Sequence, residues 1–406
     1  MKLAVVCPHF EPDVAPTGAV ITRIVHELAA RGHSIDVLTS LPWYRDHRIE
    51  PGYEGRWIRH EDVPWGRITR LHPFPTQDKR NLVRRAAAFG GFSALAAWQG
   101  MRGRSVDGVL AMSPPLTLGL TGWAIAKKRK APLVFNIQDV FPDVAIEIGA
   151  ITGKKAIAAA YRLERLCYAR ADAVTVLSDD LKDNLSAKVD DPSKIHVIPN
   201  FVDTETIRPG MSENSYRAEY GLTGKTVVMY AGNVGLSQSL DLILSAATAL
   251  AYEDDVVFVI NGGGAALDSL KEKAAGLSNV VFAPMQPIER LPEVLAAGDI
   301  HLVPLKRGLA RSSVPSKSYS ILAAGRPLIA SVDEGSEVAR VIERSDAGIA
   351  VPPEDPEAFT KAIRTLLDDT GRAAEMGAAG RRFVESWASP QAVAEQYETL
   401  FGSLTH

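Results

Sequence analysis

The sequence contains very little cysteine. Among its 406 residues only Cys7 and Cys167 occur, and neither lies in a CxxC pair or near a histidine cluster. This scarcity is typical of a reducing cytosol and gives no indication of a disulfide or a metal site. An excess of one charge is also missing, because 45 Lys and Arg are balanced by 48 Asp and Glu. The resulting net charge of −3 argues against a nucleic-acid-binding protein.

Two common phosphate-binding motifs are incomplete. The Gly-Lys-Thr at 224–226 lacks the upstream glycine of a P-loop, which disfavours an ATPase. The three glycines at 262–264 follow a predicted strand but lack the later glycine of a dinucleotide fingerprint, which disfavours a nicotinamide enzyme. The first predicted strand begins at Lys2, so no signal peptide is expected.

What is present is the pattern of an α/β protein in two halves. An apolar share of 46% and a charged share of 23% are those of a globular chain, and the length suits two domains of about 200 residues. Short apolar strands alternate with helices, which predicts parallel sheets covered on both faces. These strands are expected at 2–7, 35–39, 109–112, 133–137 and 173–177, and again at 226–231, 256–260, 280–282, 300–303 and 328–330.

Glycine-marked turns and one cationic corner are candidate anion sites. The turns are Pro-Thr-Gly-Ala at 16–19 and Gly-Asn-Val-Gly at 232–235, where glycine permits close approach of a ligand. The corner, 311–330, joins a cationic loop to a short helix and then to a strand. Arg311 and Lys317 would add charge to the amide groups of the helix start. The alternative is an ordinary corner in which Ser-Pro-Ser caps the helix.

Polar side chains follow two strands of the first half. Asp139 and Asp143 come after strand 133–137, where a carboxylate could orient an acceptor hydroxyl or accept its proton. Asp143 is explained equally well as the cap of a helix at 144–148. His9 follows the first strand, either as an acceptor contact or as a structural histidine.

Segment 79–104 is basic at both ends and apolar within, with Phe89, Phe92, Leu95 and Trp98 at helical spacing. Its apolar run is too short and too often interrupted by glycine to span a bilayer. Two interpretations stay open. The segment is either a core-packed helix of the first domain or a helix that lies on an anionic membrane surface.

Several segments together resemble the retaining GT-B glycosyltransferases of family four, and in particular their bacterial surface-polysaccharide branch. They are spread over nearly the whole chain and keep the family's order. The segments are PTGAV before ITRIVHELAARGHSIDVLTS, NIQDVFPDVAIEIGAI, ADAVTVLSDDLKDNL, HVIPNFVD, YAGNVGLSQSLDLIL, and VPSKSYSILAAGRPLIA before GSEVARVI.

This resemblance implies a GT-B fold with two Rossmann-like, doubly wound parallel-sheet domains that face a cleft. Residues 1–205 would bind the acceptor, residues 206–385 would bind the nucleotide sugar, and a helix within 386–406 would cross back onto the first domain. The implied reaction moves a hexosyl or N-acetylhexosaminyl group from a nucleoside-diphosphate sugar, foremost a UDP-sugar, to a hydroxyl of a lipid-linked glycan. It would proceed with retention and without metal or other cofactor, and the chain has no Asp-x-Asp at a strand end to hold a divalent ion.

The implied location is the cytoplasm, or the inner face of the cytoplasmic membrane with 79–104 on its surface. Two alternatives stay open: a soluble enzyme that glycosylates a small molecule, and a non-catalytic sugar-nucleotide-binding protein. No nucleic-acid partner is expected.

The positions of these candidate residues and the resemblance together give the expected site. Asp139 and Lys317 are the expected catalytic residues, and His9, Asp139 and Asp143 are the expected acceptor contacts. The expected donor contacts are Gly18, Gly232, Asn233, Arg311, Ser312, Pro315, Ser316, Lys317 and Ser320.

The chain departs from the family's pattern at two places. Ser312 and Ser320 stand where many members have a pair of glutamates that serve the donor sugar and its ribose. Asn233 and the Ser-Gln-Ser at 237–239 stand where cations are usual. The charge for a diphosphate would therefore come from Arg311 and Lys317.

Overall fold

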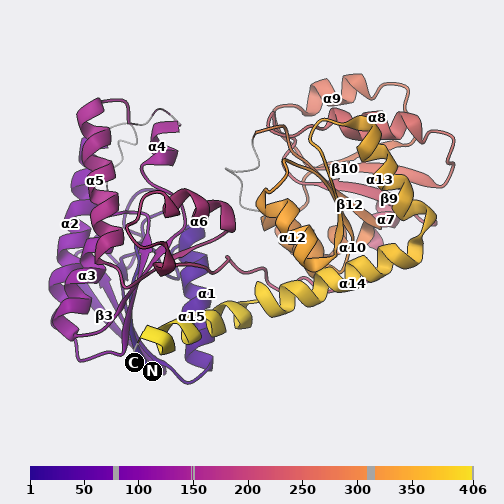
Figure 1. Cartoon of the computed structure of the whole chain (residues 1–406). Coiled ribbons are helices and arrows are strands. Elements are labelled where there is room, and N and C mark those ends of the chain that lie inside the picture. The colour runs from indigo at the N-terminus through magenta and orange to yellow at the C-terminus, as the bar shows by residue number, and fades with distance from the viewer. Residues whose placement is uncertain (76–81, 148, 150, 309–315, 405–406) are drawn as a thin grey trace. The chain divides into compact units, whose positions relative to one another are not determined.

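The computed structural model describes residues 1–75, 82–147, 149, 151–308 and 316–404 (Figure 1). The chain divides into two compact units. The first comprises Met1–Asn200 together with Val393–His406, and the second comprises Phe201–Ala392. Each contains one sheet with helices on both faces, so the predicted α/β class is confirmed.

The sheet of the first unit has the order β3-β4-β2-β1-β5-β6-β7-β8. Its strands are β1 (Lys2–Val6), β2 (Ser34–Ser40), β3 (Ile58–Val63), β4 (Gly66–Leu71), β5 (Gly108–Ser113), β6 (Leu133–Ile137), β7 (Ala173–Val176) and β8 (Ile195–Val197). All neighbours are parallel except β3 and β4, which form an antiparallel hairpin. The expectation of a wholly parallel sheet was wrong at this edge, because the half-exposed and highly charged β3 does not resemble a buried strand.

The sheet of the second unit has the order β11-β10-β9-β12-β13-β14, and every neighbouring pair is parallel. The strands are β9 (Thr226–Ala231), β10 (Val256–Asn261), β11 (Val280–Ala283), β12 (Ile300–Pro304), β13 (Leu328–Ser331) and β14 (Gly348–Val351). Central strands are buried on both faces, which explains their nearly continuous apolar sequences. The carboxyl ends of these strands meet at one edge, where open α/β sheets bind their ligands.

Helices α2 (Leu82–Gly100), α3 (Leu118–Arg129) and α5 (Lys154–Arg170) lie side by side on one face of the first sheet (Figure 1). Phe92 of α2, Ile125 of α3 and Cys167 of α5 are buried in one apolar cluster with the strands. The interpretation of 79–104 as a core-packed helix therefore holds for one side of α2. Trp98 on its other side is 47% exposed. The remaining helices of this unit are α1 (Pro16–Ala30), α4 (Asp143–Glu147), α6 (Asp179–Ser186) and the 3-10 helix η1 (Pro192–Lys194).

The last helix, α15 (Pro390–Leu404), completes the first unit. The Tyr397 hydroxyl accepts a hydrogen bond from Asn136 Nδ2 of β6 at 3.0 Å, and Phe401 packs against Gly108, where a Cβ atom would lie 2.5 Å from its ring. The preceding helix, α14 (Thr370–Trp387), lies in the second unit, and Pro390 starts the new helix after the break. The division falls at residues 200 and 392, close to the predicted bounds of 205 and 385.

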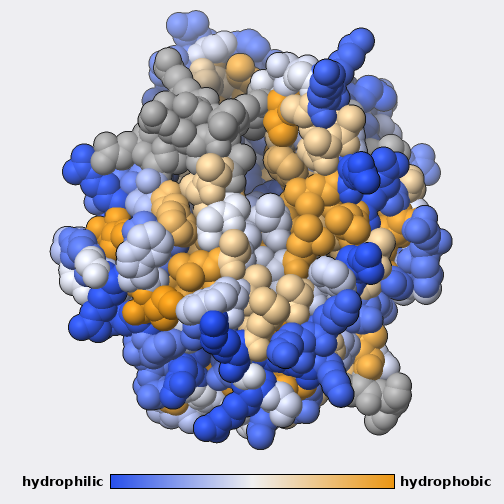
Figure 2. Space-filling view, turned by 90° about the vertical axis from the view of Figure 1, so that its left-hand side faces the viewer, coloured by the Kyte–Doolittle hydropathy of each residue, from blue (hydrophilic) through white to orange (hydrophobic). Residues whose placement is uncertain are grey.

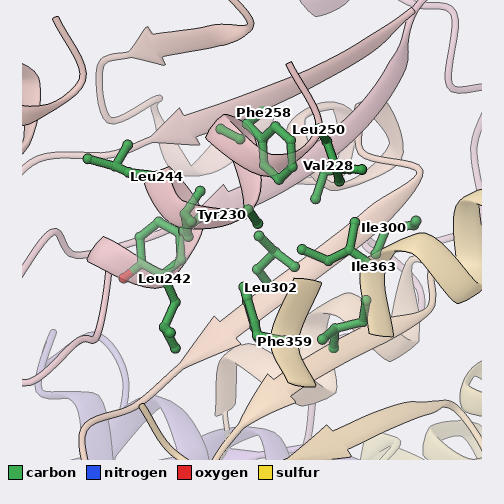
Figure 3. Packing of buried hydrophobic residues seen from close by; sticks show 14 of the residues in the cluster. Val228, Tyr230, Leu242, Leu244, Leu250, Phe258, Ile300, Leu302, Phe359 and Ile363 are labelled. Carbon is green, nitrogen blue, oxygen red and sulfur yellow. The ribbon is translucent and has the colours of Figure 1, made fainter. Parts of the chain in front are cut away.

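The core of the second unit forms between its strands and two helices (Figure 3). Val228, Phe258 and Leu302 from the strands meet Leu242 of α8 (Asp241–Ala249) and Phe359 of α13 (Pro356–Asp368). Each such buried side chain contributes about 1.5–3 kcal/mol to folding. The other helices are α7 (Ser215–Glu219), α9 (Leu267–Lys273), η2 (Ile288–Arg290), α10 (Leu291–Ala297), α11 (Ser316–Ala323) and α12 (Glu337–Ser345).

Gly377 of α14 packs closely against the turn after α11. A Cβ atom at Gly377 would lie 2.2 Å from the carbonyl oxygen of Gly325 and 3.3 Å from Arg326 Cα. Because both obstacles are backbone atoms, Gly377→Ala is expected to destabilise the protein by about 1–3 kcal/mol. Thermal melting measures the loss. Gly402→Ala in α15 is the control, since no heavy atom lies within 4 Å of its Cβ position. Equal melting temperatures for both variants would contradict this packing.

Candidate active site

Two glycine-rich loops pack against each other at the carboxyl edge of the second sheet. One follows β9 at Gly232, and the other follows β10 at Gly262 and Gly264. A Cβ atom at Gly262 would lie 1.9 Å from the Gly232 carbonyl oxygen, and one at Gly264 would lie 2.4 Å from that of Val234. Gly232 has φ of +145°, a conformation that favours glycine. The packing of backbone on backbone explains why both loops are rich in glycine.

Lys317 lies against the first of these loops. Its side chain leaves the first turn of α11, and its Nζ lies 4.2 Å from the centre of the Tyr230 ring. A Cβ atom at Gly232 would lie 2.5 Å from the same Nζ, so the glycine makes room for the ammonium. Desolvation lowers the pKa of Lys317 from 10.5 to about 8. Within the part of the chain that the structure describes, no carboxylate pairs with this ammonium, and its charge is available to an anion.

The other predicted donor contacts come from the neighbourhood of Lys317 in α11 and from the glycine loop after β9. Ser320 is half-buried three residues further along α11, and Asn233 is exposed in the glycine loop. Ser316 begins α11. Arg311, Ser312 and Pro315 lie outside the described residues, so their predicted roles stay predictions.

The first unit contains a separate cavity of about 460 Å³ at the carboxyl edge of its own sheet. Loops that follow β1, β2, β4, β5 and β6 contribute to its wall. Its aromatic lining consists of Trp43, Tyr44, Phe74 and Phe89, and its polar side chains include His9, His47 and Asp139. Rigid aromatic walls with a few polar groups are typical of a site that binds one small ring system.

His9 is held in the cavity wall by Asp13. Its Nδ1 lies 2.7 Å from Asp13 Oδ2, and Asp13 Oδ1 accepts the Tyr44 N–H at 3.0 Å. The imidazole stacks on Trp43 with ring centres 5.6 Å apart. Both His9 and Asp13 are buried, at 8% and 5% exposed. An ionised Asp13 keeps the proton on Nδ1, which leaves Nε2 as the ring nitrogen for a ligand.

Asp139 lies in the wall of the same cavity. The residue is exposed, but the surrounding protein partly desolvates its carboxylate and raises its pKa. A carboxylate with a raised pKa is a better proton acceptor than a solvated one. The structure thus brings together two of the three predicted acceptor residues, His9 and Asp139.

Comparison with known sequences identifies the chain. Residues 17–200 match the family described as Glycosyl transferase 4-like domain, and residues 225–369 match Glycosyl transferases group 1. Over 304 residues the chain is 30% identical to the glycosyltransferase WbjE of Pseudomonas aeruginosa, covering 73% of this chain and 75% of WbjE. The chain belongs to the family-four glycosyltransferases. Over 379 residues this glycosyltransferase is 28% identical to WcaI of Escherichia coli, a glycosyl transferase assigned to colanic acid biosynthesis, covering 90% and 92% of the two chains.

Solved structures confirm that this glycosyltransferase has the predicted GT-B fold. The sucrose-phosphate synthase of Thermosynechococcus elongatus superposes with a TM-score of 0.66 at 20% identity, covering 100% and 99% of the two chains. HepE of Anabaena, solved with UDP, gives 0.66 at 14% identity with both chains fully covered. WaaG, a glycosyltransferase of lipopolysaccharide biosynthesis, gives 0.59 at 16% identity, covering 97% and 99%.

Asp143 of this glycosyltransferase does not lie in the cavity wall with Asp139. Its carboxylate accepts hydrogen bonds from the Tyr161 hydroxyl at 3.0 Å, Asn184 Nδ2 at 3.2 Å and Lys188 Nζ at 2.6 Å. Burial alone would raise the pKa of Asp143, but the bonds from Lys188 and Asn184 lower it. The carboxylate thus belongs to a structural network at the start of α4. This network accounts for Asp143 without a contact to the acceptor substrate.

Gly18 also has a packing role that the sequence did not reveal. Gly18 was expected in a turn before the helix. The helix α1 begins at Pro16, so Gly18 lies in its first turn. A Cβ atom at Gly18 would lie 2.9 Å from His9 Cβ. This contact explains the glycine without a donor phosphate, and its donor role stays a prediction.

Proposed function

We propose that this family-four glycosyltransferase transfers a sugar, with retention, from a nucleoside-diphosphate donor to a hydroxyl of a lipid-linked glycan. The donor is foremost a UDP-sugar, and the enzyme works in the cytoplasm at the inner face of the cytoplasmic membrane. Its coarser role, a glycosyltransferase of polysaccharide biosynthesis, follows from WcaI and from the two family matches. The observation that supports the proposal best is the desolvated ammonium of Lys317 against Gly232, with which no carboxylate of the described residues pairs.

The donor diphosphate would lie on the glycine loop after β9. Gly232 makes room for the Lys317 ammonium beside this loop, and Lys317 supplies a positive charge where negative charge develops as the diphosphate departs. We propose that this charge, with that of Arg311, takes the place of a metal or other cofactor. Treatment with EDTA should accordingly leave turnover unchanged.

The acceptor would occupy the aromatic cavity of the first unit. Trp43 and Phe74 offer flat apolar surfaces on which a sugar ring can stack, and Asp139 with His9 Nε2 can hold one hydroxyl. We propose that the Asp139 carboxylate orients this hydroxyl and draws its proton as the bond to the donor sugar forms. Asp13 then acts as a positioning residue, because it fixes the His9 ring.

One observation favours a second candidate, a sugar-nucleotide-binding protein without transferase activity. Ser312 and Ser320 replace two carboxylates that resembling enzymes use for the donor. A soluble enzyme with a small-molecule acceptor is the third. Release of nucleoside diphosphate from a panel of donors, with and without membrane extract, separates these cases. Turnover that needs the extract supports the proposal.

Donor preference is testable by thermal shift with UDP, GDP, dTDP and uridine. Ligand binding raises the melting temperature by mass action, so the tightest nucleotide gives the largest shift. We expect UDP to give the largest shift and uridine a much smaller one, because uridine lacks the diphosphate that Lys317 recognises. A shift with uridine equal to that with UDP would contradict a diphosphate site at Lys317.

A further inference from the structure

One face of the first unit concentrates positive charge. It is formed by α2, α3 and α5 and the residues directly after α2 and α3, and it is called the α2–α3–α5 face below. Exposed basic side chains occur along all of it, at both ends and in the middle of α5. They are Arg102, Arg104, Lys127, Lys128, Lys130, Lys154, Lys155, Arg162, Arg165 and Arg170.

Among the described residues, the three helices of this face expose no acidic side chain. The sequences of α2 and α3 contain no Asp or Glu, and the one acidic residue of α5, Glu164, is fully buried. The bordering Asp107 and Asp172 accept hydrogen bonds from the backbone amides of Lys2 and Leu133. Since the whole chain has a net charge of −3, this face differs sharply from the average surface.

Apolar side chains lie among these cations. Trp98 is 47% exposed, Leu166 is 41% exposed, and Met101, directly after α2, is 37% exposed. Figure 2 views the molecule from this side, where orange and pale side chains run through the middle and blue ones surround them. A guanidinium group lies over each of two tryptophan rings. The Cζ atom of Arg102 lies 3.4 Å from the Trp98 ring centre, and that of Arg170 lies 4.8 Å from the Trp123 ring centre.

We propose that the α2–α3–α5 face binds the surface of an anionic lipid bilayer. Basic side chains are attracted by acidic headgroups, and tryptophan prefers the boundary between headgroups and acyl chains. Three helices lying side by side present these groups on one broad surface, as a peripheral membrane contact requires. A nucleic acid or acidic protein would use the charge but would not need the exposed Trp98 and Leu166.

This proposal changes the surface that the sequence suggested. Segment 79–104 was expected to provide the contact, but most of the described exposed charge is on α3 and α5. No helix among the described residues is long and apolar enough to cross a membrane. The inference deepens the proposed membrane location. Lipid binding needs no sugar transfer, so only the biological role of this binding rests on the proposed function.

Vesicle flotation tests the proposal with the full chain. Wild-type protein is expected to float with vesicles that contain phosphatidylglycerol, to stay behind with phosphatidylcholine alone, and to be released by added salt. The triple variant Lys155→Glu, Arg162→Glu, Arg165→Glu is expected to lose binding by at least about a hundredfold, because each basic residue near an anionic surface contributes about a factor of five and the new carboxylates are repelled. The matched control, Lys271→Glu, Lys361→Glu, Arg382→Glu, reverses three exposed cations of the second unit and should float like the wild type.

Folding of each variant is checked by its melting temperature without ligand, and the glutamine versions of the three α5 residues provide a milder second set. A retained melting temperature with lost flotation supports the face as a lipid contact, whatever the outcome for UDP binding and transfer. Equal flotation of the wild type, the α5 variants and the control would overturn the proposal. So would binding of the wild type to RNA or to an acidic polypeptide but to no vesicle.

Discussion

Replacing Asp139 with asparagine is expected to lower the turnover rate by about 10²–10⁴-fold, with the protein still folded. The substitution keeps the size of the side chain but removes the group that would draw the acceptor proton. Because Asp139 has a raised pKa, wild-type turnover should fall as the pH drops through that pKa, at a higher pH than for a solvated aspartate. In Asp139→Asn this acid limb should disappear. Initial rates of nucleotide release across pH measure both effects.

Asp143→Asn is the matched control, since it makes the same chemical change four residues away. Asp143 lies outside the cavity and is bonded to Lys188 and Tyr161, so its loss should cost about 1–3 kcal/mol of stability. Its turnover, measured well below the melting temperature, should stay close to that of the wild type. If Asp143→Asn lost as much turnover as Asp139→Asn, the assignment of the acceptor carboxylate would be wrong.

Replacing Lys317 with methionine should weaken UDP binding by about 10–100-fold and lower turnover by about 10²–10³-fold. Methionine keeps the apolar stem against Tyr230 but removes the charge. The melting temperature without ligand should not fall, because the desolvation that lowers the pKa of Lys317 opposes burial of its charged form. Lys306→Met, at an exposed lysine, is the control and should bind UDP normally. Normal UDP binding by Lys317→Met would refute the diphosphate role.

The same lysine predicts how nucleotide binding depends on pH. A diphosphate binds the protonated ammonium, and the pKa of about 8 means that this form is lost as the pH rises above that value. Affinity for UDP should therefore fall up to tenfold per pH unit above about pH 8. Below that pH, Lys317 should cause no further change in affinity. Titrations of wild type and Lys317→Met compare the two. A wild-type affinity that stays level through this range would contradict the assignment.

The sequence predicted the buried strands well, because strands covered on both faces must be apolar. The predictions at 133–137 and 226–231 match β6 and β9 to the residue, and the restart of the pattern after residue 200 indicated the second unit. The strands it missed are β3, β4, β8 and β14, which either carry charged residues, as β3 and β4 do, or are only three or four residues long, as β8 and β14 are. Their position depends on neighbours in the sheet and not on their own composition.

The candidate site was predicted where one short segment determines it. Gly232 and Lys317 were recognised from their own motifs, and the structure places them in contact. The aromatic cavity was not, because Trp43 and Phe74 come from separate loops and Phe89 comes from α2, and only the folded domain brings them together. Asp13 was missed as the partner of His9, although an aspartate four residues from a histidine was visible. Asp143 could be assigned to its network only once Lys188, 45 residues away, was in place.

The membership of α15 in the first unit has a consequence for how the protein is made. Val393, Tyr397 and Phe401 are buried against a sheet whose strands all precede residue 200. During synthesis this sheet leaves the ribosome early, yet its last covering helix arrives only after the entire second unit has been translated. The first unit is therefore synthesised first but completed last. The face of its sheet that α15 covers stays exposed in the nascent chain for about 190 residues of elongation.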